Sequence, residues 1–180
     1  MAAIQSYIDL RFAVSDHVGN RAISDVFPRL VQMAEADFNQ RLRTRYQITD
    51  ATLTFEDGVS PLPPDFLELI EVSHRPGMKR RYQIDGFNIT IPGFSGDLDV
   101  QFYAKIPTLT CSPTACNWLL AQFPAVYLYG VGLQAAKHLR DVELSQATDQ
   151  LYGYALDELK VADERARWSA SVVRVQGCTP

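Results

Sequence analysis

Three carboxylates in segment 65–71, DFLELIE, have the type and spacing that could support catalysis. Asp65, Glu68 and Glu71 follow one another at intervals of three residues. A hydrolase that uses two carboxylates needs one of them buried with a raised pKa, so that it can act as the general acid. Acids at this spacing more often form the solvent-exposed face of an amphipathic stretch. The segment therefore supports a carboxylate-dependent, cell-wall-degrading hydrolase only as an alternative function.

Cysteine chemistry is the next candidate. Cys111 and Cys116 flank a four-residue loop and Cys178 stands alone, which is an odd number for a disulfide framework. A metal would need two more ligands besides the loop pair. The histidines have no recognisable ligand spacing: His17, His74 and His138. We expect reduced loop thiols and no metal site, and the sequence leaves open whether the loop pair forms a disulfide.

A basic cluster, Lys79-Arg80-Arg81, lies between Arg75 and the aromatic Tyr82. Such a cluster could contact phosphates without reading base sequence, or contact acidic residues of a partner protein. The plainer alternative is an exposed segment at the side of a hairpin, with no binding role. A pI near 5.3 argues against a dedicated nucleic-acid-binding protein. The chain also lacks phosphate-loop, dinucleotide-binding, nucleophile-elbow and H-E-x-x-H motifs, so we expect no cofactor and no enzymatic activity.

The composition is that of a folded globular protein. The 180 residues are 47% apolar and 21% charged, which predicts a single domain, residues 1–170, with an extended tail, residues 171–180. No apolar run is long enough for a membrane helix, and the start has no pattern of a secretory signal. We therefore expect synthesis in a cytoplasm and no membrane partner.

The net charge of −4 is confined to one region. Residues 141–168 carry seven acids and three bases, whereas the remainder is balanced. The plain interpretation is a solvated helix face. The alternative is an acidic surface that repels DNA, as would suit the wall of a channel through which a duplex slides.

Apolar periodicity predicts an α+β fold: a mainly helical bundle with a small antiparallel sheet inserted between the N-terminal and C-terminal helices. The longest stripe, from Ile23 to Leu42, has apolar residues at steps of three and four. Alternating segments and turn residues predict strands between positions 46 and 106, with Asp85-Gly86 as the central pair of a type I′ hairpin turn. The expected helices span residues 3–14, 22–44, 124–140 and 143–168.

The helix near residue 130 is apolar almost all the way round. Its small residues would let another helix or subunit approach closely. Two of them are glycines, each costing about 1 kcal/mol of helix propensity relative to alanine, so tight packing must offset that cost. The residues predicted to make this packing are Tyr129, Gly130, Gly132 and Ala136.

The tail contains the β-prone run Val172-Val173-Arg174-Val175. Such a run at a free end predicts a strand that pairs with another chain's sheet edge or fills its groove. A frayed end, or a strand added to the chain's own sheet, is the alternative.

Several segments in this order resemble the head-to-tail adaptor (connector) proteins of tailed bacteriophages. The resemblance covers some 150 residues and is carried by AEADFNQRLR, LPPDFLEL, YQIDGFNITIP, QFYAKIP, NWLLAQFPAVYLYG and ERARWSAS. Two features depart from the family pattern. The loop 111–116 carries two cysteines where polar residues would be expected, and His138-Leu139-Arg140 is more basic than expected before an acidic last helix.

The resemblance implies a structural role in the virion, at the junction of capsid and tail. Such adaptors form a ring, commonly of twelve copies, under the portal protein. The ring extends the channel for double-stranded DNA and offers a docking platform for a nozzle or tail-tube protein. A generic oligomeric scaffold with no portal partner is a further alternative.

The resemblance also implies which parts meet which partner. In the family the C-terminal helix and tail engage the portal, and the inserted sheet lies toward the tail. Carried over to this sequence, the portal-interface candidates are Arg165, Arg167, Trp168, Val172, Val173, Arg174 and Val175. The tail-side candidates are Arg80, Arg81, Asp85 and Phe87.

Overall fold

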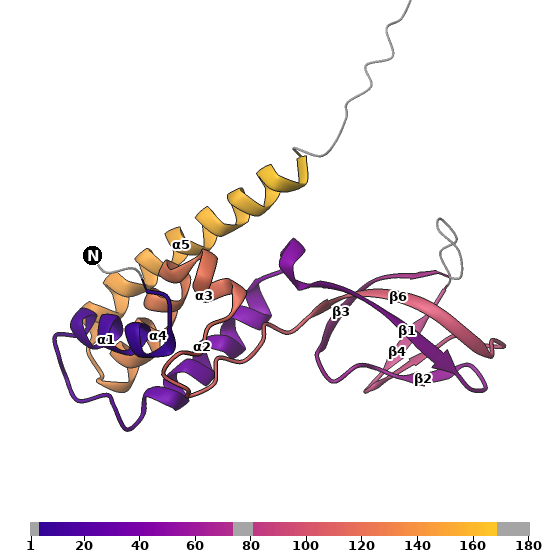
Figure 1. Cartoon of the computed structure of the whole chain (residues 1–180), viewed down its shortest axis with the longest axis horizontal. Coiled ribbons are helices and arrows are strands. Elements are labelled where there is room, and N and C mark those ends of the chain that lie inside the picture. The colour runs from indigo at the N-terminus through magenta and orange to yellow at the C-terminus, as the bar shows by residue number, and fades with distance from the viewer. Residues whose placement is uncertain (1–3, 74–80, 169–180) are drawn as a thin grey trace, which may run out of the picture. The chain divides into compact units, whose positions relative to one another are not determined.

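A computed structural model describes residues 4–73 and 81–168 of the chain (Figure 1). They fall into two compact units: unit 1 comprises Met1–Ala34 with Leu109–Pro180, and unit 2 comprises Glu35–Thr108. The single domain expected from the sequence stays a prediction, and each unit is described by itself. None of the described helices is both long and apolar enough to cross a membrane.

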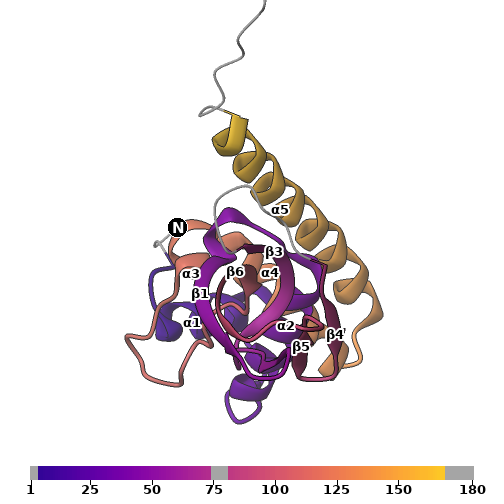
Figure 2. The same ribbon diagram turned by 90° about the vertical axis from the view of Figure 1, so that its right-hand side faces the viewer.

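Unit 1 is helical. Its helices are α1 (Tyr7–His17), α3 (Trp118–Gln122), α4 (Pro124–His138) and α5 (Val142–Trp168), and α2 (Phe27–Arg41) runs from unit 1 into unit 2. Within unit 1, α4 packs against α1, α3 and α5. Figures 1 and 2 both show the last turns of α5 extending beyond α3 and α4.

The helix bounds follow from capping groups. Helix α1 begins at Tyr7, not at residue 3, because the Ser6 hydroxyl accepts a hydrogen bond from the Asp9 N–H and so caps the helix. In α4, Pro124 occupies the first turn, where its missing N–H costs least. Asp141 caps α5 by accepting from the Leu144 N–H at 3.1 Å.

Helix α2 is shorter than the predicted span of 22–44. Its second residue is Pro28, which is tolerated in a first turn but not in a helix interior. After Arg41 the chain leaves the helix, and Thr44 and Gln47 hydrogen-bond each other around a short 3₁₀ turn, Arg45–Gln47. The apolar stripe runs past both helix ends, and Ile23 and Leu42 are buried outside the helix.

Unit 2 contains two three-stranded antiparallel sheets. The first has the order β1 (Ile48–Phe55), β6 (Gly96–Ala104) and β3 (Phe66–Ser73), and the second has β2 (Val59–Pro61), β5 (Asn88–Thr90) and β4 (Gln83–Asp85). The α+β class is thus confirmed, but the region between positions 46 and 106 holds two sheets where one was predicted. Strand β2 lies in a proline-rich segment and has Pro61 at its end, where a missing N–H is tolerated.

The β4–β5 hairpin exists, but its turn is displaced by one residue from the prediction. Asp85 pairs with Asn88, so the central residues are Gly86 and Phe87. Only Gly86 has a positive φ, of 59°. Glycine at the first central position is typical of a type II′ turn, and the predicted type I′ turn at Asp85-Gly86 is wrong.

The core of unit 2 lies on one face of the first sheet. Along β6 the buried residues alternate with outward-facing ones, as the pleat of a strand requires. The buried cluster consists of Phe55, Val72, Ile89, Ile91, Leu98, Val100, Phe102 and Ala104.

Candidate functional site

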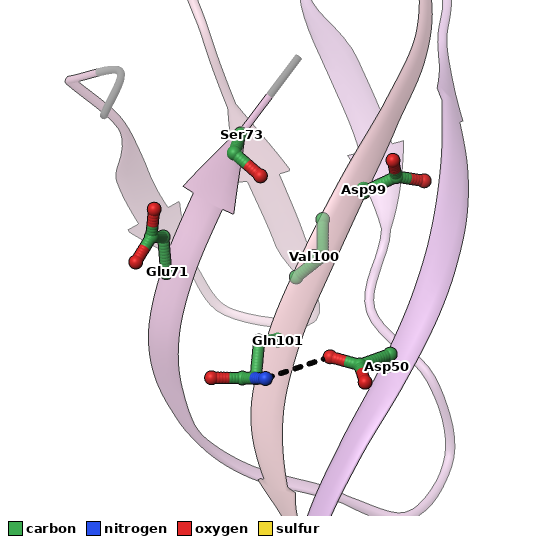
Figure 3. A pocket seen from close by; sticks show the side chains of 6 residues that line it. All are labelled: Asp50, Glu71, Ser73, Asp99, Val100 and Gln101. Atoms are coloured by element: carbon green, nitrogen blue, oxygen red, sulfur yellow. Dashed lines mark hydrogen bonds between the residues drawn. The ribbon is translucent and has the colours of Figure 1, made fainter. Parts of the chain in front are cut away.

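The outer face of the first sheet gathers acidic side chains (Figure 3). Two irregularities in the pairing of β3 with β6 place Glu68 opposite Tyr103 and Glu71 opposite Gln101, so both glutamates lie on the outward face. A shallow hollow there is lined by Asp50, Glu71, Ser73, Asp99, Val100 and Gln101. The sequence predicted the glutamates but not the two aspartates, which come from strands far apart in the chain.

This acidic face is open and held by surface hydrogen bonds. Gln101 donates to Asp50 at 2.9 Å, and the Thr52 hydroxyl donates to Asp99 at 2.9 Å. Glu68 forms an ion pair with Arg43 at 2.7 Å, and its side chain is 58% exposed. The structure therefore does not give Glu68 the burial that a general acid of the hydrolase hypothesis requires.

The loop with two cysteines is anchored to the start of α1. The N–H of Tyr7 donates to Ala115 O at 2.9 Å, and the N–H of Ile8 donates to Pro113 O at 3.2 Å. Cys111 and Cys116 are both free and exposed. Burial, followed by a hydrogen bond with the Cys111 side chain, raises the pKa of Tyr7 to about 12. Among the described residues, no group of three or more histidine, cysteine or acidic side chains could hold a metal.

The predicted packing residues lie at the centre of unit 1. Gly130, Gly132 and Ala136 are buried, and Tyr129 is half-buried. A Cβ built on Gly132 would lie 3.0 Å from His17 Cδ2 and 3.6 Å from Thr148 Cγ2. The glycine therefore allows α1 and α5 of the same chain to approach α4. A role of these four residues between subunits stays a prediction.

The tail-side candidates that the structure describes are at the surface of unit 2. Arg81 and Asp85 are exposed, and Phe87, at the tip of the β4–β5 turn, is 89% exposed. Ile84 and Tyr82 are also exposed apolar residues of this hairpin. Arg80 and Lys79 lie outside the described residues.

Three of the portal-interface candidates, Arg165, Arg167 and Trp168, belong to the end of α5. Arg165 is exposed, and Arg167 forms an ion pair with the buried Asp163 at 2.9 Å. The side chain of Trp168 lies outside the described residues. So do Val172, Val173, Arg174 and Val175.

The chain matches the sequence profile of a protein family described as SU10 adaptor protein, over residues 5–176. This span includes every helix and strand of both units. No curated protein matches the chain.

Proposed function

The chain belongs to the SU10 adaptor protein family, a family of phage head–tail adaptors, and we propose that it forms a ring between portal and tail. The ring, of twelve copies, extends the DNA channel below the portal and carries the tail proteins. The family match over residues 5–176 is the observation that carries this proposal. A phage adaptor is a component of the virion, and we propose that it works by binding alone, without catalysis.

The portal contact is made by the end of α5 and the residues after it. Arg165 is exposed. The last turns of α5 extend beyond α3 and α4, where a partner has access to them (Figure 1). The segment Val172-Val173-Arg174-Val175 adds binding energy by ordering on the portal. Ordering costs about 1–2 kcal/mol of backbone entropy per residue, so the contacts of this segment must exceed that cost.

The tail contact is made by the β4–β5 hairpin. The exposed Phe87 supplies an apolar anchor, and Arg81 and Asp85 supply charges around it. Double-stranded DNA passes through the ring without sequence-specific recognition, which fits a chain with a net charge of −4.

The test is the mass of the complex with the portal protein from the same genome, measured by light scattering. We expect the wild-type chain to add a ring's mass to the portal, and a chain without residues 171–180 to bind much more weakly. A Phe87→Ser chain is the matched control, because its change lies in unit 2 and should leave portal binding intact. The portal assignment would be refuted if the wild-type chain and the portal protein eluted separately at every salt concentration. Unchanged portal binding by the truncated chain would refute the role of residues 171–180.

A further inference from the structure

The corner between α4 and α5 presents two cations, Lys137 and Arg140, that have no counter-charge among the described residues. Lys137 and Arg140 border a shallow hollow of about 240 Å³ in unit 1, together with Ala136, Asp141, Val142, Ser145 and Gln146. The carboxylate in this hollow is already compensated, because Asp141 binds Arg21 at 2.8 Å and caps α5. Within residues 4–73 and 81–168, neither Lys137 nor Arg140 forms an ion pair. The hollow therefore carries an excess positive charge beside the exposed side chain of Val142.

The backbone of Arg140 adds a second observation. Its φ is +57°, in the left-handed region where glycine is favoured at the end of a helix. The turn itself is made by backbone bonds, from the Arg140 N–H to Lys137 O and from the Asp141 N–H to Ala136 O, both 3.1 Å long. Cations near the end of α4 are favoured by the helix dipole. The dipole favours a cation at this end of α4 but does not require an arginine at the left-handed position itself.

The outer face of α5 has the complementary character. Leu151, Tyr154, Glu158 and Val161 follow one another at steps of three, four and three residues, which places them on one stripe of the helix. The three apolar members are exposed, and Tyr154 is 69% exposed. Asp157 beside the stripe has a side chain that is 74% exposed and lies 3.6 Å from Lys160. We call these four residues and Asp157 the outer stripe of α5.

We propose that the hollow at the α4–α5 corner of one copy receives the outer stripe of α5 of the next copy in the ring. Lys137 and Arg140 pair with Asp157 and Glu158 of the neighbouring copy, and Val142 contacts its Tyr154. The inference rests on the ring of the proposed function and names a contact within it. Opposite charges around exposed apolar side chains are the usual composition of a protein interface with a polar rim.

Two different surfaces on one chain also satisfy the geometry of a ring. A closed ring of many copies requires a heterologous contact, in which one patch binds a different patch of the next copy. The corner and the outer stripe are such a pair, since they share no residue. A DNA duplex is the competing occupant of the cationic corner, and the exposed Val142 beside the cations favours a protein surface instead.

Charge reversal tests the pairing. A corner variant, Lys137→Glu with Arg140→Glu, and a stripe variant, Asp157→Lys with Glu158→Lys, should each lose the ring mass in sedimentation velocity, alone and with portal present. A chain with all four substitutions should regain it. An equimolar mixture of the two variants should also regain it, because alternating copies place each reversed corner against a reversed stripe and each native corner against a native stripe. Arg81→Glu with Lys105→Glu, an equal charge change in unit 2, is the matched control and should assemble normally.

Arg140→Gly separates assembly from folding. Glycine suits the backbone at this position, so the melting temperature should equal or exceed that of the wild type while assembly weakens. Full assembly of this variant would show that the contact between copies does not need the Arg140 side chain, and would count against the proposal.

The outcomes distinguish this contact from the proposed function. The pairing would be overturned if the corner variant assembled normally, or if the fourfold variant failed to regain assembly. In either case, portal binding by the wild type would still uphold the adaptor role. Where the wild type binds no portal, the adaptor role fails. Carbodiimide cross-linking of isotope-labelled with unlabelled chain then tests the pairing alone, and absence of a Lys137 link to Asp157 or Glu158 between copies would refute it. Loss of binding to a fluorescent DNA duplex by a corner variant that still assembles would assign the corner to DNA instead.

Discussion

The imidazole Nε2 of His17 lies 2.9 Å from the hydroxyl oxygen of Thr148, and this hydrogen bond joins α1 to α5. The two residues are 131 positions apart in the chain. The ring of Tyr129 from α4 meets the imidazole edge-on, with 5.7 Å between ring centroids. His17 thus lies where three helices of unit 1 converge, and burial lowers its pKa from the ordinary value of 6.5.

This lowered pKa predicts a loss of stability in mild acid. Well above pH 6.5 the imidazole is neutral in both the folded and the unfolded chain. Below that pH the unfolded chain binds the proton first, so the free energy of unfolding falls as the pH falls, until the folded-state pKa is passed. Urea unfolding at a series of pH values from neutral to mildly acidic should show this slope.

Two substitutions isolate the contribution of His17. His17→Gln should flatten the slope, because it removes the titrating group. His138→Gln should keep it, because His138 is exposed. Equal slopes in the wild type and in His17→Gln would rule out His17 as the cause.

The close approach at Gly132 predicts that a large side chain there destabilises the chain. A Cβ at this position would already lie 3.0 Å from His17 Cδ2. Gly132→Leu should therefore lower the free energy of unfolding by about 1–3 kcal/mol through overpacking. Gly153 in α5 is the matched control, because a Cβ there meets nothing within 4 Å. Gly153→Ala should stabilise by about 1 kcal/mol through helix propensity. An unchanged melting temperature of Gly132→Leu would contradict the packing.

Helices were the more predictable part of this fold. Apolar stripes at steps of three and four located α2 and α5, because burial of one face sets that period, and α4 was located as a helix that is apolar almost all the way round. The predicted first and last residues of the helices were less accurate. The Ser6 cap of α1, and the burial of Ile23 and Leu42 outside α2, depend on contacts that apolar periodicity does not reveal. Of the second sheet, the β4–β5 hairpin was predicted from its turn residues. Strand β2 was missed, because three residues are too few to show an alternation.

The site residues were less predictable than the fold. The contact of His17 with Thr148 joins segments that no local pattern relates. The acidic sheet face depends on pairing irregularities in β3 that turn Glu68 and Glu71 to the same side. At the α4–α5 corner the sequence did show an unexpectedly basic segment, His138-Leu139-Arg140. It gave no sign of the left-handed backbone at Arg140, because no glycine marks that position.

The displaced hairpin turn supplies a last prediction, which separates binding from stability. Phe87 at the tip is 89% exposed, whereas Ile89, two residues on, is fully buried in the core of unit 2. Phe87→Ser should change the free energy of unfolding by less than about 0.5 kcal/mol, because little apolar area leaves the core. Ile89→Ala should lower it by about 2–5 kcal/mol through loss of buried methylene contacts. If the hairpin is the tail-side contact, Phe87→Ser should also weaken capture of the tail proteins of the same genome on immobilised chain. Full capture by the Phe87→Ser chain would move the tail contact away from this hairpin.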